Sequence, residues 1–355
     1  MISREGQNFK LVSLIAVRAP LRISFVGGGS DLPAFYTRHP GRVVSAAIDK
    51  YVYVVANHTP LIDKIAVRYS KTEIVNAPEE LQHTRVRAAL IDLGIRNNLE
   101  IATFASLPAR TGLGSSSSFS VALMRALYAL KGHNLTAEEA ASEAVRLEID
   151  LLQEPIGKQD QYAAAFGGLN VITFQPDGKV QVDPLMLDYK VESDLEHHML
   201  VFYTGLTRDA GTILEEQNRN IGDDAKFRTM QKMVAQVEDF VACLKSGNLP
   251  GLGEILNAGW QMKRSLASSI PLATTDVLYE AALAAGAWGG KLLGAGGGGC
   301  LLFLAPIDRR DAVRDAMTKT AATMNLIDFK EVPVRFSQPG SEIQFRENHG
   351  FRTTN

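Results

Sequence analysis

The sequence has few cysteines and none in a metal-binding pattern. Its 355 residues contain only Cys243 and Cys300, which lie far apart and lack the paired spacing of zinc ligands. Neither a disulfide framework nor a structural zinc site is therefore indicated, and such sparse cysteine usage is typical of a reducing compartment.

Long hydrophobic runs and an excess of one charge are missing as well. The formal net charge is only -2, without a cluster of like charges, so nothing indicates nucleic-acid binding. The apolar run after Lys10 stops at Arg18, too short to cross a membrane, and no signal-peptide pattern precedes it. We expect a cytoplasmic protein that acts on small molecules, without nucleic-acid or membrane partners, and its oligomeric state stays open.

Length and composition indicate two domains. A chain of 355 residues with 46% hydrophobic content exceeds the size at which one core usually keeps growing. The charged run Asp188 to His198 marks a shift in composition. We therefore predict an N-terminal domain over residues 1–193 and a C-terminal domain over residues 194–355, with a frayed tail past Gly340.

The most informative stretch is a glycine- and serine-rich turn between a strand-like run and an apolar helix. Glycines let the chain turn tightly and approach a ligand, and the first amides of the helix have no partner within it, which favours an anion such as phosphate. A serine cap is the alternative, but four poor helix formers in a row favour a second role. No Gly-Lys-Ser/Thr follows, which argues against P-loop NTPases. The residues are Gly112, Leu113, Gly114, Ser115, Ser116, Ser117 and Ser118.

A second glycine turn, Gly27 to Gly29, leads into Ser30 and Asp31. Its glycines permit close backbone approach, and the Asp31 carboxylate could accept hydrogen bonds from two hydroxyls, as a polyol such as a sugar would offer. Asp31 could instead cap a short helix over Pro33 to Tyr36, and the local sequence leaves both roles open.

Two further acids carry possible chemistry. Glu148 lies on the apolar stripe of a helix predicted from Thr136 to about Leu152, so its carboxylate needs a cation or a donor, for which a buried salt bridge is the plain explanation. Asp160, two residues after Lys158, could take a proton from a hydroxyl while the lysine stabilises negative charge. Capping of a helical piece over Gln161 to Phe166 is the alternative for Asp160.

In the C-terminal half, a run of glycines separates two apolar strand-like segments at Gly294 to Gly299. So much glycine in an ordered core indicates that another backbone segment or a ligand presses against it. Arg208 offers a fork for phosphate or carboxylate, with a surface ion pair as the alternative.

Taken in order, the Asp31 turn, the Gly-Leu-Gly-Ser-Ser-Ser-Ser stretch and Gly-Ala-Gly-Gly-Gly-Gly resemble the three-motif signature of the GHMP small-molecule kinases, over nearly the whole chain. Residues 27–36 and 204–208 are most similar to the D-glycero-D-manno-heptose 7-phosphate kinases of bacterial surface-polysaccharide synthesis. Galactokinases are a more distant likeness. They read Gly-Glu-His-Thr-Asp where this chain has Gly27 to Asp31, so an acid and a histidine are missing and a bulkier sugar becomes plausible.

This resemblance implies an α+β fold: an N-terminal domain like ribosomal protein S5 domain 2 and a ferredoxin-like C-terminal domain, with the active site between them. It implies ATP bound by Gly112 to Ser117, Mg²⁺ held by Ser116 and Glu148, Asp160 as catalytic base, and Arg22 near the transferred phosphoryl group. The sugar would contact Gly28, Gly29, Ser30 and Asp31, and the third motif would use Gly294, Gly296, Gly297 and Gly298. Apart from the resemblance, Lys158, Arg208 and Arg110 are our candidates for binding a distal substrate phosphate.

The activity so implied is phosphorylation of the anomeric O1 of D-glycero-D-manno-heptose 7-phosphate. The alternatives are an L-fucokinase or another sugar-1-kinase, and, in a different class, a catalytically inactive nucleotide or sugar sensor.

Overall fold

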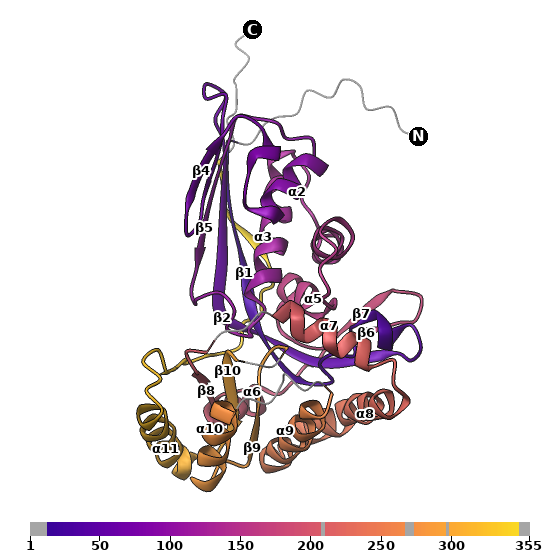
Figure 1. Ribbon diagram of the computed structural model, residues 1–355, viewed down its shortest axis with the longest axis vertical. Helices are drawn as coiled ribbons and strands as arrows, with labels where there is room; N and C mark the ends of the chain where they lie inside the picture. Colours follow the sequence, from indigo (N-terminus) through magenta and orange to yellow (C-terminus); the bar gives the residue numbers. More distant parts are fainter. Residues whose placement is uncertain (1–12, 207–209, 267–272, 296–297, 348–355) are drawn as a thin grey trace.

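The computed structural model describes residues 13–206, 210–266, 273–295 and 298–347. Within these ranges the strands form an eight-stranded sheet and a four-stranded sheet. Figure 1 shows the long strands of the first sheet standing above a lower body of helices that surrounds the second.

The larger sheet is built around two long antiparallel strands, β1 and β2. In β1, the residues that share one parity, among them Val17, Leu21 and Phe25, are buried, as their alternation predicts. The path of the sheet is β12-β1-β2-β5-β3-β4, and β6 pairs with both β2 and β7. The strands are β1 (Leu14–Val26), β2 (Gly41–His58), β3 (Ile65–Arg68), β4 (Thr72–Val75), β5 (Leu99–Ala105), β6 (Leu169–Phe174), β7 (Val180–Pro184) and β12 (Glu342–Glu347).

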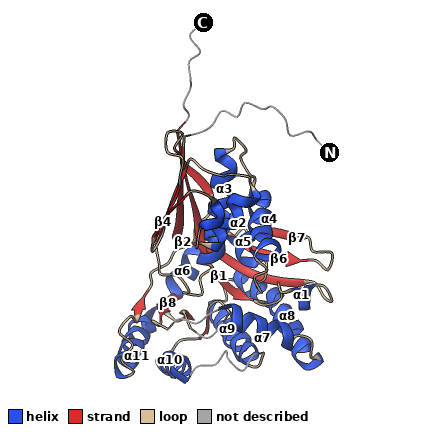
Figure 2. Ribbon diagram, turned by 45° about the horizontal axis from the view of Figure 1, so that its top comes forward, coloured by secondary structure: helices blue, strands red, loops and turns tan. Residues whose placement is uncertain are grey.

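Helices cover one face of this sheet, as Figure 2 shows for α2 to α5. The helix α3 packs on β1 and β2, and its apolar stripe, which includes Leu123 and Leu127, is buried. α4 begins with a complete capping box between Thr136 and Glu139. The elements are α1 (Pro33–Tyr36), η1 (Pro78–Glu80), α2 (Thr84–Asp92), α3 (Ser115–Leu130), α4 (Ala137–Val145), the π-helical turn η2 (Arg146–Leu151), α5 (Gln159–Phe166) and α6 (Tyr189–His198).

The smaller sheet has the order β11-β8-β10-β9 and packs against C-terminal helices. Phe202 and Phe303 from its strands join Trp260 and Tyr279 in a separate apolar core. The elements are β8 (Met199–Tyr203), α7 (Ala210–Asn220), α8 (Asp224–Ser246), α9 (Leu249–Arg264), α10 (Ala273–Ala284), β9 (Gly289–Leu292), β10 (Cys300–Leu304), η3 (Ile307–Arg309), α11 (Arg310–Thr323) and β11 (Lys330–Glu331).

The two sheets are linked by contacts that close the space between them. The Phe25 ring stacks on Phe240 of α8 at 5.3 Å between centroids, and Lys291 of β9 donates to the carbonyls of Ser24 and Phe25. The predicted boundary after residue 193 falls inside α6 and stays a prediction. No helix within the described ranges is long and apolar enough to cross a membrane.

Several local expectations were wrong. The prediction of a frayed tail past Gly340 fails because residues 342–347 pair with β1 as β12. The β-branched and aromatic residues of Gly41 to Val55 predict a pair of strands, whereas the whole segment lies in one continuous strand, β2. Conversely, the residues from Glu331 to Phe336 predict a strand, but only Glu331 of them belongs to the short strand β11 (Lys330–Glu331), which pairs with β8. Each miss concerns pairing with a distant partner, which local sequence does not encode.

Candidate active site

The glycine-serine turn delivers the chain from β5 into α3 in the form that the sequence predicts. Gly112 and Gly114 both have a φ of 78°, in the left-handed region that favours glycine. Gly114 is the N-terminal cap residue of α3, and no side chain caps the helix. The first amides of α3 are therefore free of a side-chain cap, at the positive end of the helix dipole.

The serines of this turn have different surroundings. Ser116 is exposed and Ser115 is half-buried, whereas Ser118 is buried and donates to the carbonyl of Pro20 at 2.7 Å. Ser117 is buried as well. Just before the turn, the Thr111 hydroxyl is buried and has no hydrogen-bond partner among the described residues. Ser116 and, in part, Ser115 are therefore open to a bound anion.

The third glycine motif packs directly on this turn. A Cβ on Gly112 would lie 2.5 Å from the Leu293 carbonyl oxygen, and one on Gly294 would lie 2.7 Å from the Gly112 Cα. The amide of Cys300 donates to the carbonyl of Thr111 at 2.9 Å. The expected close approach of another backbone segment is thus confirmed. Gly298 lies in the same loop with a φ of 144°, whereas Gly296 and Gly297 lie outside the described residues.

Arg22 and Asp160 meet beside the turn. The Nε and Nη2 atoms of Arg22 donate to the two carboxylate oxygens of Asp160 at 2.7 and 2.6 Å, a bidentate pair. The remaining Arg22 nitrogen, Nη1, donates to the Gly112 carbonyl at 2.6 Å. Lys158 is the cap residue of α5, so Asp160 lies in the first turn and does not serve as its cap. One arginine thus links the predicted base to the predicted phosphate turn.

Asp31 lies next to this pair. Its side chain accepts hydrogen bonds from the amides of Gly29 and Gln159, and it does not cap α1. Burial, and to a lesser degree the nearby Asp160 carboxylate, raise the pKa of Asp31 above its ordinary value. The Ser30 hydroxyl donates to the Arg42 carbonyl and accepts from its amide, which fixes the start of β2.

Glu148 is fully buried, as its place on an apolar stripe predicts. It accepts hydrogen bonds from Ser120 at 2.9 Å and Gln161 at 2.6 Å, and it forms a salt bridge with Arg85 at 3.1 Å. The expected cation or donor is thus found, in the plain form of a buried salt bridge. Ser120 follows Ser116 by one helical turn, so both lie on one face of α3.

The surroundings of Glu148 also fit a hard cation. The Gln161 side-chain oxygen is buried beside it, and no described residue donates a hydrogen bond to it. Carboxylate, amide and hydroxyl oxygens are the ligands that Mg²⁺ prefers. No group of three or more His, Cys, Asp or Glu side chains suited to a metal lies within the described ranges. Mg²⁺ needs no such group when substrate phosphates and water complete its shell.

The structure gives little information on the residues that we expect to bind a distal substrate phosphate. Lys158 donates to the Gly178 carbonyl at 3.0 Å and lies 5.0 Å from the Tyr36 ring centre. Arg110 is exposed, and Arg208 lies outside the described residues. Of the substrate residues expected from the first motif, Gly28 and Gly29 are buried in the turn before Asp31.

Sequence reasoning missed four polar side chains of this region. Ser120 and Gln161 contact Glu148, and their spacing from Ser116 and Asp160 could have indicated them. Lys263 and Lys291 come from the C-terminal part of the chain and are buried. Burial and the positive charges of Lys263 and Arg22 lower the pKa of Lys291 well below its usual range. No local pattern marked either lysine.

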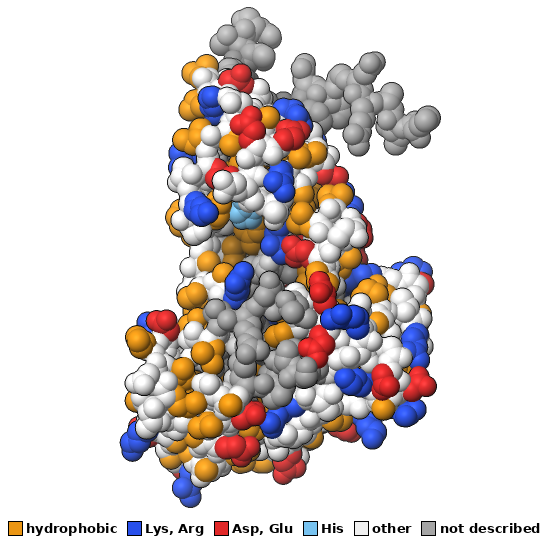
Figure 3. Space-filling view, in the orientation of Figure 1, with side chains coloured by type: hydrophobic (Ala, Val, Ile, Leu, Met, Phe, Trp, Pro, Cys, Tyr) orange, Lys and Arg blue, Asp and Glu red, His pale blue; other side chains and the backbone are white. Residues whose placement is uncertain are grey.

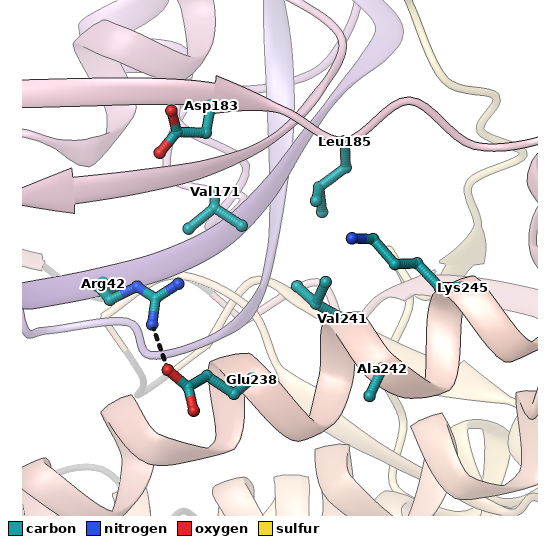
Figure 4. A pocket seen from close by; sticks show the side chains of 8 residues that line it. All are labelled: Arg42, Val171, Asp183, Leu185, Glu238, Val241, Ala242 and Lys245. Carbon is teal, nitrogen blue, oxygen red and sulfur yellow. Dashed lines mark hydrogen bonds and ion pairs between the residues drawn. The ribbon is translucent and has the colours of Figure 1, made fainter.

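A separate open pocket of about 400 Å³ lies between β2, β6, β7 and α8. Its walls carry both charges, and Arg42 pairs with Glu238 across its edge at 3.1 Å, as Figure 4 shows. It contains none of the predicted site residues. On the face shown in Figure 3, acidic and basic side chains are interspersed, which matches the small net charge.

Comparison with known proteins gives two family matches. The model of the GHMP kinase N-terminal domain matches residues 81–168, and that of the GHMP kinase C-terminal domain matches residues 240–323. A D-glycero-alpha-D-manno-heptose 7-phosphate kinase of Campylobacter jejuni is 25% identical over 332 residues, covering 90% of this chain and 98% of that protein. A Pyrococcus furiosus galactokinase is 26% identical over 344 residues, covering 87% and 94%.

Solved structures show the same fold. A D-glycero-D-manno-heptose 1-phosphate kinase from Bacteroides thetaiotaomicron superposes with a TM-score of 0.76 at 24% identity, covering 93% of this chain and 99% of that one. Lactococcus lactis galactokinase in complex with galactose gives a TM-score of 0.73 at 19% identity, covering 93% and 95%.

Proposed function

Because this chain carries both GHMP kinase domains, we propose that it phosphorylates the anomeric O1 of D-glycero-D-manno-heptose 7-phosphate with ATP. The predicted family, its α+β fold and the enzyme class, a phosphotransferase with an alcohol acceptor, are confirmed by the matches. The product would be the 1,7-bisphosphate, an intermediate toward nucleotide-activated heptose for surface polysaccharides. The 25% identical Campylobacter enzyme supports this choice of acceptor.

One observation carries the proposed chemistry: Arg22 holds Asp160 and the Gly112 carbonyl at the same time. The acid that would take the acceptor proton therefore lies within one side chain of the turn that would bind the ATP phosphates. Reacting groups held this close turn a bimolecular step into an effectively unimolecular one. Asp160 removes the O1 proton, and Arg22 holds that carboxylate in place beside the phosphoryl group in transfer.

The remaining roles belong to the same proposal. The free amides at the start of α3, with Ser115, Ser116 and Ser117, bind phosphate oxygens. Ser116, Glu148 and Gln161 would hold Mg²⁺, which would neutralise charge at the phosphates. Asp31 accepts hydrogen bonds from sugar hydroxyls near Asp160. Gly28, Gly29 and Ser30 form the turn that positions Asp31. We assign Lys158 and Arg208 to the distal phosphate, and Gly294, Gly296, Gly297 and Gly298 to the nucleotide.

A panel of acceptors tests this proposal. ATP turnover is measured with the heptose 7-phosphate, the same heptose without its phosphate, L-fucose and D-galactose. We expect the highest kcat/KM for the heptose 7-phosphate. A higher value for L-fucose would overturn this assignment in favour of a fucokinase. ATP-analogue binding without turnover of any acceptor would favour the sensor.

A further inference from the structure

Lys263 is a buried lysine of α9 that lies at the junction of the two glycine motifs. The residue is only 5% exposed, and its ammonium donates to the Gly294 carbonyl at 2.6 Å. A lysine ammonium has three donors. Among the described residues the other two have no acceptor, so a buried cation is left with most of its hydrogen-bonding capacity unused.

Lys263 and Arg22 each donate a hydrogen bond to a backbone carbonyl of one of the two glycine turns. Gly294, which accepts from Lys263, lies against Gly112, which accepts from Arg22. Two cations that are far apart in the sequence, Arg22 of β1 and Lys263 of α9, therefore donate hydrogen bonds to the two glycine turns where these turns meet. Among the described residues, Asp31, Asp160, Arg22 and the buried Lys291 are the groups that interact electrostatically with Lys263. The lysine thus belongs to the group formed by the predicted base and the predicted sugar ligand.

We propose that Lys263 binds the γ-phosphoryl group of the nucleotide and neutralises its charge during transfer, an inference that rests on the proposed kinase function. In this step the bond from the acceptor O1 to phosphorus forms as the bond from phosphorus to the β-phosphate oxygen breaks. The O1 proton goes to Asp160, and Lys263 keeps its own. The turn at Gly112 has no lysine of its own, and α9 supplies one from the other domain.

The protonation of Lys263 gives this role a pH signature. Burial first and then the charge of Arg22 lower the pKa of Lys263 to about 8, against the opposing effect of Asp31 and Asp160. A lysine with a lowered pKa is charged below that pH and loses its charge above it. The kcat/KM of the free enzyme should therefore fall as pH rises through about 8. Lys263→Met should lack this fall.

Nucleotide binding tests the contact without any acceptor. The Kd values of ADP and of the non-hydrolysable analogue AMP-PNP are measured with Mg²⁺ for the wild type, Lys263→Met and Lys263→Arg. Only AMP-PNP carries a γ-phosphoryl group. Lys263→Met should therefore raise the Kd of AMP-PNP about tenfold or more and the Kd of ADP less than about twofold. Lys263→Arg, which keeps the charge, should fall between the two. The exposed Lys319 gives a matched control, because Lys319→Met should change neither Kd.

The outcomes separate this inference from the function on which it rests. An equal effect of Lys263→Met on both nucleotides would overturn it, because a lysine that only anchors Gly294 would act on both. A rise confined to the KM of the phosphorylated acceptor would also overturn it, by assigning Lys263 to the distal phosphate. Selective loss of AMP-PNP binding, with no acceptor turned over by the wild type, would support Lys263 and refute the proposed kinase activity.

Discussion

Asp160 and Arg22 form one hydrogen-bonded unit although 138 residues separate them in the chain. Arg22 is nearly buried, with 4% of its side chain exposed, whereas Asp160 is 24% exposed. The arginine is thus fixed by its partners, and the carboxylate keeps an open side for an acceptor. This asymmetry is what a base needs if it must hold its orientation and still receive a proton.

Asp160→Asn should therefore lower kcat by about 10²- to 10⁴-fold, the usual contribution of a general base. AMP-PNP should bind nearly as before, because the phosphate turn stays in place. Asp177→Asn, on an exposed turn, is the matched control and should leave kcat unchanged. A kcat near that of the wild type in Asp160→Asn would remove this residue from the base role.

Glu148 combines a salt bridge with the proposed metal site, and two variants separate these roles. Glu148→Gln should raise the Mg²⁺ concentration for half-maximal activity by roughly tenfold or more. Arg85 also pairs with Glu154 at 2.5 Å, so Glu154→Gln perturbs the same arginine without touching the metal ligand. A magnesium titration of both variants decides the matter. Equal shifts would mean that Glu148 acts only through Arg85.

At the scale of the elements, the Gly112 turn needs glycine, because a side chain at this position would collide with the backbone of another segment. Gly112 combines a left-handed φ with contact to Leu293. Gly132 has a similar φ of 81°, but no described atom lies within 4 Å of a Cβ placed on it. An alanine at Gly132 would therefore add backbone strain without a steric clash. The two glycines therefore separate conformational strain from close packing of the motifs.

Gly112→Ala should lower the free energy of unfolding by roughly 2–5 kcal/mol, the sum of left-handed strain and overpacking. It should also weaken AMP-PNP binding, because the turn must move away from Gly294. Gly132→Ala should cost only about 1–2 kcal/mol and leave nucleotide binding intact. Urea unfolding and calorimetric titration measure both effects. Similar losses in the two variants would contradict the packing argument.

At the scale of the whole molecule, the C-terminal strand β12 returns to the first sheet and pairs with β1. β12 pairs with β1 at five positions, and Arg18 forms a salt bridge with Glu342 at 2.5 Å. Without β12, the edge of β1 would be open to other strands. Arg22 of the candidate active site lies on the same strand β1. Pairing with β12 therefore helps to hold in place the strand that positions Arg22.

Deleting residues 342–355 should destabilise the protein by about 1–5 kcal/mol, at about 0.2–1 kcal/mol for each cross-strand pair. It should also promote aggregation through the exposed edge of β1. Deleting only residues 348–355 keeps every described contact of β12 and is the control. Equal unfolding midpoints in urea for the two truncations would show that β12 adds no stability.

The sequence by itself determined the elements whose signal is local. The alternation in β1, the apolar stripe of α3 and the runs Leu169–Phe174 and Met199–Tyr203 match the strands and helix of the structure, because burial of one face imposes its own period. The position of Glu148 on an apolar stripe likewise predicted its complete burial. Glycines in a row predicted the close packing of two backbone segments.

Only the tertiary structure decided which distant groups meet. Nothing near Arg22 specifies Asp160, nothing near Gly294 specifies Lys263, and the strand-forming residues of β12 do not reveal that β1 has an open edge. Side-chain periodicity reports which face of an element is buried, whereas pairing depends on the relative placement of all elements. The site is made of such pairings, and for that reason its residue types could be predicted but its geometry could not.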